Sequence, residues 1–145
     1  MDSTTLEKLI SFRRALHSFP EISGQETHTV EMVVDFIKYY NPDEIITNIG
    51  GAGIAFIYDG DLDGDTLMLR ADLDALPIQE TNNFSYKSTV EGVSHKCGHD
   101  GHMAILAGVA TQIKRRTLRK GKVILLYQPA EKISTPKTLT KLRKL

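Results

Sequence analysis

The hydrophobic pattern changes its period along the chain, and this change limits the folds open to it. Residues 5–18 and 25–40 repeat their apolar side chains every three to four positions, which predicts two amphipathic helices. Asn41–Pro42 is a typical stop for the second helix. The apolar positions are Leu6, Leu9, Ile10, Phe12 and Leu16 in the first segment and Val30, Val33, Val34, Ile37 and Tyr40 in the second.

Short runs of strand-like composition follow the two helices. They are separated by glycine and aspartate clusters, which predict turns at Gly50–Gly51 and within residues 59–65. The run "KVILLYQ" is apolar almost throughout, as in a strand that is covered on both faces. This order of elements predicts an α/β fold layered around a mixed sheet. Strands are expected at 44–49, 53–60, 66–72 and 122–128, and a third helix at 100–116.

Length and composition indicate an ordinary globular domain. The chain has 145 residues and a formal net charge of zero, so no overall field favours nucleic acid or an anionic membrane. Nowhere do about 18 apolar residues run together, as a membrane span would need. The single cysteine cannot form an internal disulfide, which fits a reducing compartment. We therefore expect a cytoplasmic protein with no nucleic-acid or membrane partner.

The stretch "HKCGHDGH" (95–102) holds three of the five histidines and the only cysteine. Gly98 separates Cys97 from His99 and would let the backbone curl so that both side chains face one ion. A thiolate with an imidazole suits zinc or another late divalent metal. His102 and Asp100 are possible additional ligands or partners that orient a ligand. The spacing alone leaves a second interpretation open, a polar turn with a buried cysteine and solvated rings.

Three carboxylates follow predicted strands. Asp72 and Asp74 come at the end of one strand and Glu131 after another, and sites in α/β sheets form at the carboxyl ends of strands. The alternatives are turn aspartates and a helix N-terminal acid. His17 and His28 fall on the first two helices and are expected at the surface or half-buried, without a catalytic part.

Four segments together resemble a known family, the metal-dependent amidohydrolases that act on N-acyl amino acids. Hippurate hydrolases, auxin-conjugate hydrolases and N-acetyl-diaminopimelate deacetylases belong to it, and it is akin to aminoacylases and zinc carboxypeptidases. The resemblance implies the N-terminal part of a zinc-exopeptidase-like three-layer fold with a mixed central sheet. The segments are "RRALHSFPEISGQET" (13–27), "LRADLDALPIQE" (69–80), "HKCGHDGHMAILAG" (95–108) and "VILLYQPAE" (123–131).

The resemblance also implies roles for individual residues. Cys97 and His99 match two ligands of a binuclear centre that takes zinc, manganese, cobalt or nickel. Glu131 matches the general base, and Asp72 and Asp74 match the catalytic acidic pair beside the metals. Such a centre activates water for attack on an amide, with a carboxylate as base. The implied function is hydrolysis of the amide bond of N-acyl amino acids or small peptides.

The end of the sequence departs from the family pattern. Lys132 stands where the resemblance implies a second, metal-binding glutamate, and residues 132–145 carry five basic and no acidic side chains. We therefore expect a catalytic part at 1–131, a basic tail at 132–145, and a truncated chain without the dimerisation domain of the often dimeric family. Two certain ligands predict weak zinc binding. The alternative to an impaired enzyme is a non-catalytic fragment that binds metal weakly or docks to a partner.

Overall fold

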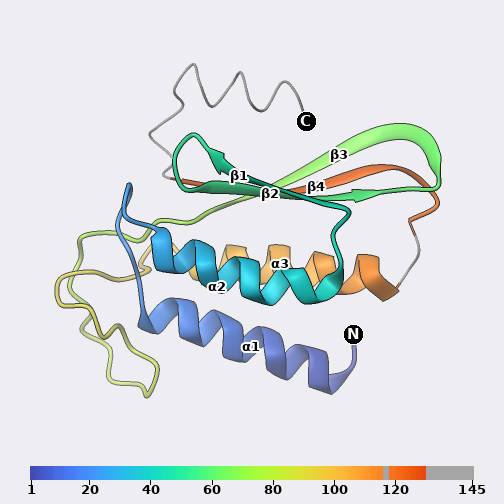
Figure 1. The fold of residues 1–145 in the computed structure, drawn as a ribbon. Coiled ribbons are helices and arrows are strands. Elements are labelled where there is room, and N and C mark those ends of the chain that lie inside the picture. Colours follow the sequence, from blue (N-terminus) through green and yellow to red (C-terminus); the bar gives the residue numbers. More distant parts are fainter. Residues whose placement is uncertain (116–117, 130–145) are drawn as a thin grey trace.

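The computed structural model describes residues 1–115 and 118–129. Within these residues it contains helices and a mixed sheet, which confirms the predicted α/β class (Figure 1). In chain order the elements are α1 (Ser3–Ser18), α2 (Thr27–Ile37), the 3₁₀ turn η1 (Lys38–Tyr40), β1 (Glu44–Ile49), β2 (Gly53–Asp59), β3 (Leu62–Asp72), α3 (His99–Arg115) and β4 (Lys120–Gln128).

The strands lie in the order β1-β2-β4-β3. β2 pairs antiparallel with both β1 and β4, whereas β3 and β4 run parallel. The parallel register places Asp72 opposite Gln128, so the last residues of β3 and β4 lie side by side. The carboxyl ends of β3 and β4 therefore meet at one edge of the sheet.

The start of β3 differs most from the sequence prediction, and the other boundaries agree to within about three residues. Residues 59–65 are not all a turn, because β3 already begins at Leu62. Leu62 pairs with Lys120 on β4, and the register shifts before Thr66 pairs with Lys122. Gly121 makes this irregular pairing possible. Its φ is 79°, and a Cβ at this position would collide with the carbonyl oxygen of Asp65.

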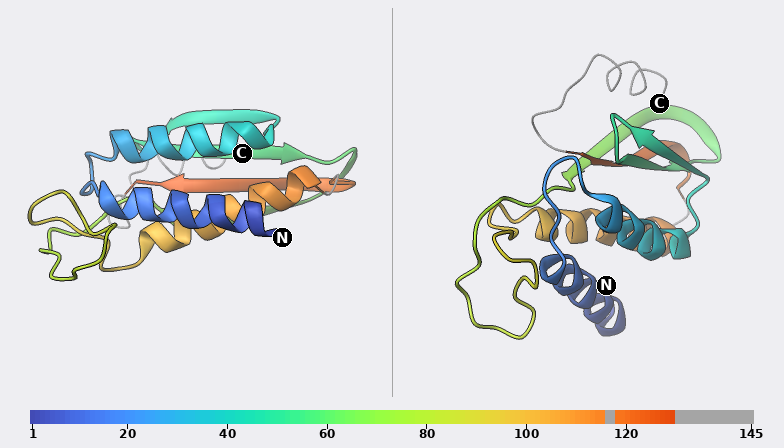
Figure 2. Two further views of the ribbon diagram at one scale, coloured as in Figure 1. Left: turned by 90° about the horizontal axis from the view of Figure 1, so that it is seen from below. Right: turned by 60° about the vertical axis from the view of Figure 1, so that its left-hand side comes forward.

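The helices of the described residues cover one face of the sheet. α2 and α3 lie against the sheet and α1 packs beneath them, an order that the right-hand view of Figure 2 repeats. Asp2 caps α1 by accepting a hydrogen bond of 2.7 Å from the backbone of Thr5. The main core joins side chains of all three helices to the sheet, among them Leu9, Phe12, Leu16, Val33, Ile37, Tyr40, Phe56, Met103, Leu125 and Tyr127.

Strand β4 is buried on both faces, as its apolar run predicts. Leu125 and Tyr127 belong to the main core, whereas Ile124 and Leu126 belong to a second cluster with Ala55 and its neighbours on β2. Neighbouring residues of a strand point to opposite faces, so these two sets lie on the two sides of the sheet. Because β4 pairs in parallel with β3, the two strands end at neighbouring positions, Asp72 and Gln128.

Two apolar positions of α1 are more exposed than their spacing suggests. Leu6 is 51% and Ile10 is 40% exposed, and both line a groove between α1 and α3.

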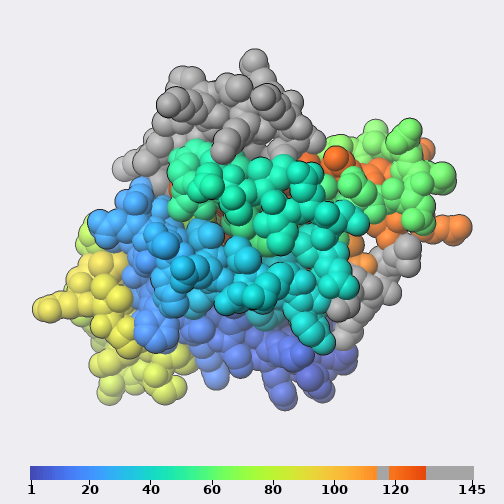
Figure 3. Space-filling view, viewed as in Figure 1, coloured from blue at the N-terminus to red at the C-terminus, as the bar shows by residue number. Residues whose placement is uncertain are grey.

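Among the described helices, none has the length and apolar character that a membrane crossing requires. Residues 73–98 form a long connection at one end of the molecule, visible in yellow in Figure 3.

Candidate metal-binding site

Asp72 ends strand β3 with its side chain held from two sides. Its Oδ1 accepts a hydrogen bond of 2.6 Å from Nε2 of Gln128, the residue opposite it on β4. Its Oδ2 lies 3.4 Å from a guanidinium nitrogen of Arg70. Asp72 is only 6% exposed, and it lies where β3 and β4 end together.

Asp74 brings the start of α3 to the same edge. Nδ1 of His99 lies 2.8 Å from the backbone carbonyl oxygen of Asp74 and 3.3 Å from its Oδ1. A carbonyl oxygen only accepts, so Nδ1 of His99 carries the hydrogen and Nε2 keeps its lone pair. A backbone carbonyl that holds one nitrogen while the other is left for a ligand is the usual arrangement of a metal-binding histidine.

Cys97 lies two residues before His99 and is an exposed free thiol. Gly98 between them has a φ of 80°, a conformation that favours glycine, and its N–H donates to the carbonyl of His95. The chain therefore turns sharply between the two candidate ligands. His102 lies one helical turn further, exposed, with its ring centroid 6.0 Å from that of His99.

The residues fit part of a metal centre. The thiol of Cys97 and Nε2 of His99 are suitable donor atoms, and Oδ1 of Asp74 is buried without a hydrogen-bond partner in the described part of the chain. Across residues 1–115 and 118–129, however, no three metal-ligating side chains lie together closely enough to hold an ion. Glu131, the expected general base, and Lys132 lie outside the described residues.

Asp100 points away from this edge and toward α1. Its Oδ2 lies 2.7 Å from Nε of Arg13 and 2.7 Å from Nδ1 of His17, and the side chain is fully buried. His17 is itself only 4% exposed, so its expected place at the surface or half-buried is wrong. His28 has a side chain that is 53% exposed, as expected.

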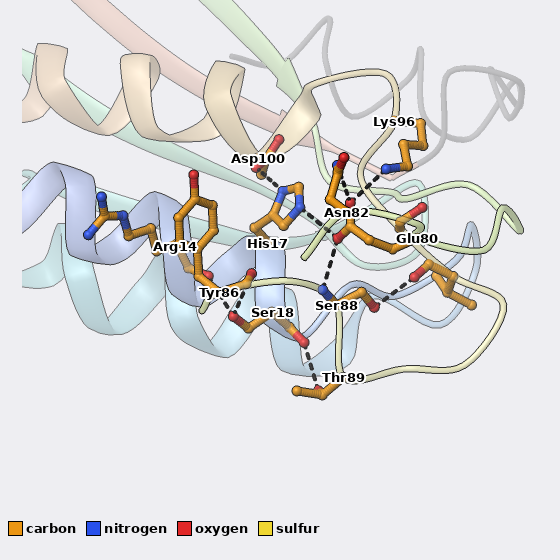
Figure 4. Close-up of polar contacts among 12 residues, drawn as sticks. Arg14, His17, Ser18, Glu80, Asn82, Tyr86, Ser88, Thr89, Lys96 and Asp100 are labelled. Carbon is orange, nitrogen blue, oxygen red and sulfur yellow. Dashed lines mark hydrogen bonds and ion pairs between the residues drawn. The ribbon is translucent and has the colours of Figure 1, made fainter. Parts of the chain in front are cut away.

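Glu80 completes a buried polar network with His17 (Figure 4). Its Oε2 accepts from Nε2 of His17 at 3.0 Å and from the backbone N–H of Ser88 at 2.9 Å. Its Oε1 accepts from Lys96 at 2.6 Å and from Asn82 at 2.9 Å. Burial alone would raise the pKa of Glu80, but these hydrogen bonds outweigh it and lower the pKa to about 2.

His95 is a further buried histidine, and the sequence argument did not single it out. It is 5% exposed, and neither ring nitrogen has a hydrogen-bond partner among the described residues. Burial lowers the pKa of His95 to about 4, although the carboxylate of Asp100 acts in the opposite direction. Its place in "HKCGHDGH" was the available signal. His17 and Glu80 lie in two of the segments that carry the family resemblance, but neither segment by itself indicates their contact, which joins positions 63 residues apart.

The parallel strand ends, the buried aspartates and the thiol–imidazole pair define an α/β protein with a candidate metal site. The sequence pattern of peptidase family M20/M25/M40 matches residues 68–142, about half of the chain. The chain therefore belongs to this family of hydrolases, and the resemblance found in the sequence is confirmed. The match continues past residue 131, where the basic tail was expected to begin.

Individual relatives give the same result. N-acetylcysteine deacetylase of Bacillus subtilis is 38% identical over 128 residues, which are 88% of this chain and 34% of that protein. Thermostable carboxypeptidase 1 of Saccharolobus solfataricus is 38% identical over 125 residues, 85% of this chain and 32% of that protein. The chain thus spans about a third of the length of these relatives.

A solved structure shares the fold. The crystal structure of a dinuclear metal-binding peptidase of the M20 family from Bacillus subtilis matches with a TM-score of 0.88 and 37% sequence identity. The match covers 96% of this chain and 40% of that chain. The described fold is therefore that of one part of an M20 peptidase.

Proposed function

We propose that this chain hydrolyses, with a divalent metal, the amide bond of N-acyl amino acids or small peptides. The observation that carries the proposal is the contact of 2.8 Å between Nδ1 of His99 and the Asp74 carbonyl, which leaves Nε2 as a ligand atom two residues from Cys97. The relatives include a deacetylase of N-acetylcysteine and a carboxypeptidase. Both names describe enzymes that cleave an amide bond.

Cys97 and His99 would hold the metal through Sγ and Nε2. A thiolate with an imidazole favours zinc, cobalt or nickel over a metal such as magnesium, and manganese is also taken by proteins that the sequence resembles. When bound, the ion supplies Lewis acidity that polarises a carbonyl and lowers the pKa of water. The single thiol must stay reduced to bind, which fits the expected cytoplasmic location.

The acidic residues have separate roles in this proposal. Asp74 orients His99, and Asp72 is fixed by Gln128 at the edge where the substrate would lie. The carboxylate of Glu131 would act as general base and accept a proton from the attacking water. Lys132 places an ammonium next to this carboxylate in the sequence, so we expect turnover to be slow.

Release of free amine from N-acetyl-L-cysteine and other N-acetyl amino acids tests the proposal. The purified chain is incubated with zinc, cobalt or manganese, and amine is followed with an amine-reactive fluorophore. We expect slow release that EDTA and Glu131→Gln both abolish, while Glu91→Gln, a change at an exposed side chain, leaves it intact.

Two results would count against this function. Release that persists in EDTA would reject the metal mechanism. No release with any of the metals would reject hydrolysis by this chain and leave weak metal binding or docking to a partner as the alternative.

A further inference from the structure

We propose that His17, a residue of α1, is a positioning residue for the ligand pair Cys97 and His99. The inference rests on the proposed metal site and assigns no chemical step to His17. It holds that the buried imidazole ties together the two backbone segments on either side of the ligand pair. The sequence gives no local sign of this, because α1 is separated from both segments by more than sixty residues.

Both nitrogens of the His17 ring are engaged by carboxylates. Nδ1 lies 2.7 Å from Oδ2 of Asp100, and Nε2 lies 3.0 Å from Oε2 of Glu80. The two carboxylate side chains are at most 2% exposed. Figure 4 shows His17 between the two acids, with one ring nitrogen toward each carboxylate.

The two acids are connected to the immediate neighbours of the ligands. Asp100 directly follows His99, so its contact with His17 fixes the first turn of α3. Glu80 accepts a hydrogen bond of 2.6 Å from Lys96, which directly precedes Cys97. The His17 ring is thus connected, through the carboxylates of Asp100 and Glu80, to the residues on both sides of the turn that carries Cys97 and His99.

Such support matters more where the ligands are few. The described residues contain no group of three metal-ligating side chains that could hold an ion, so the spacing of Cys97 and His99 depends on the surrounding contacts. Cys97 is exposed and follows a glycine-containing loop, which by itself does not fix a thiol. Loss of a hydrogen bond made directly to a ligand typically weakens metal binding about 10- to 100-fold, and His17 is one contact further out, so we expect a loss of up to about tenfold.

The fold does not depend on His17 alone for charge balance. Arg13 also pairs with Asp100 at 2.7 Å, and Lys96 with Glu80, so we expect each acid to keep a partner when His17 is replaced. The rings of Phe84 and Tyr86 remain around the position, with centroids 5.6 Å and 5.8 Å from the His17 ring. Replacement should therefore loosen the connection between the two acids more than it unfolds the chain.

The test compares His17→Gln with His28→Gln, a matched change at an exposed histidine of α2. The first readout is the imidazole nitrogen NMR spectrum of the metal-free chain. We expect His99 to carry its hydrogen on Nδ1 in the wild type and in His28→Gln, and to lose this preference in His17→Gln. The second readout is the cobalt–thiolate absorption during a Co²⁺ titration. We expect the affinity of His17→Gln for cobalt to fall by up to about tenfold.

Lys96→Met is an independent variant for which a positioning role and a purely electrostatic effect predict opposite changes in cobalt affinity. Removal of a cationic side chain close to a metal site strengthens metal binding if only charge matters. If the connection from Glu80 to the residue before Cys97 matters, Lys96→Met weakens cobalt binding instead. Lys87→Met, at an exposed position of the same connection, is its control and should leave cobalt binding unchanged.

The outcomes separate the two proposals. A folded His17→Gln chain with an unchanged His99 spectrum and unchanged cobalt affinity would overturn the positioning role, as would tighter cobalt binding by Lys96→Met. A cobalt absorption that survives Cys97→Ser, or none in the wild type, would reject the metal site itself. In that case the metal-free spectrum of His99 still decides whether His17 orients it.

Discussion

At the scale of single residues, His99 and Asp100 show how neighbours in a helix serve different sides of a molecule. Successive helical residues point about 100° apart, whereas residues three apart share a face. His99 therefore faces Asp74 at the edge of the sheet, and Asp100 faces His17 on α1. His102 lies on the His99 side, which keeps it as a possible further ligand.

Glu80 makes stability depend on pH in the acidic range. Its pKa is lowered from 4.5 to about 2 in the folded chain, where Lys96 and His17 face the carboxylate. Between these values the unfolded chain binds the proton and the folded chain does not, so the contribution present above pH 4.5 is lost as the pH falls to about 2.

Urea unfolding of the wild type and Glu80→Gln at several pH values measures this contribution. The wild type should be the more stable chain near neutral pH, and its advantage should shrink as the pH falls through the acidic window. Glu91→Gln serves as the control for loss of one charge at an exposed position. A wild-type advantage that stays constant down to about pH 2 would contradict the account.

The residue types of the site could be predicted, but their long-range partners could not. The Cys-x-His spacing and the aspartates after a strand are local patterns, and the structure brings Asp74 and His99 together. The direction of Asp100 and the burial of His17 depend on how α1 packs against α3. His17 contacts a residue 83 positions away, and nothing in the helical spacing of α1 indicates that contact.

At the scale of elements, the paired ends of β3 and β4 position the candidate site. Apolar runs and glycine clusters predicted every helix and strand of the described residues to within a few positions. The start of β3 was missed because residues 59–65 have the composition of a turn. Their extended conformation comes from pairing with β4, which a local pattern does not contain.

Gly121 provides the test at this scale. Gly121→Ala adds the cost of an alanine at positive φ, about 1–2 kcal/mol, and also a collision with the carbonyl of Asp65. Gly92→Ala is the matched control, since Gly92 also has a positive φ of 72° but open space around its Cβ position. We expect both variants to lower the free energy of unfolding in urea, Gly121→Ala by clearly more.

An equal loss of unfolding free energy in both variants would mean that the close approach of β3 to β4 at Asp65 does not contribute to stability. A larger loss in Gly92→Ala would contradict the irregular register between the two strands. The comparison is informative because both substitutions add the same single carbon atom.

At the scale of the whole molecule, the chain is one part of an M20 fold that carries a pair of candidate ligands. The matches cover most of this chain and about a third of its relatives. The described residues place His99 against Asp74 at one edge of the sheet, two positions after Cys97, and we propose that the network around His17 supports this pair. A site with two candidate protein ligands should bind metal reversibly, since stable zinc sites take three or four.

Zinc binding by the purified chain tests the central claim most directly. In a calorimetric titration, followed by dialysis and elemental analysis, we predict weak binding that dialysis removes and that either Cys97→Ser or His99→Gln abolishes. The control His28→Gln should bind zinc like the wild type. Zinc binding that survives both ligand substitutions, or two ions per chain retained after dialysis, would contradict the account.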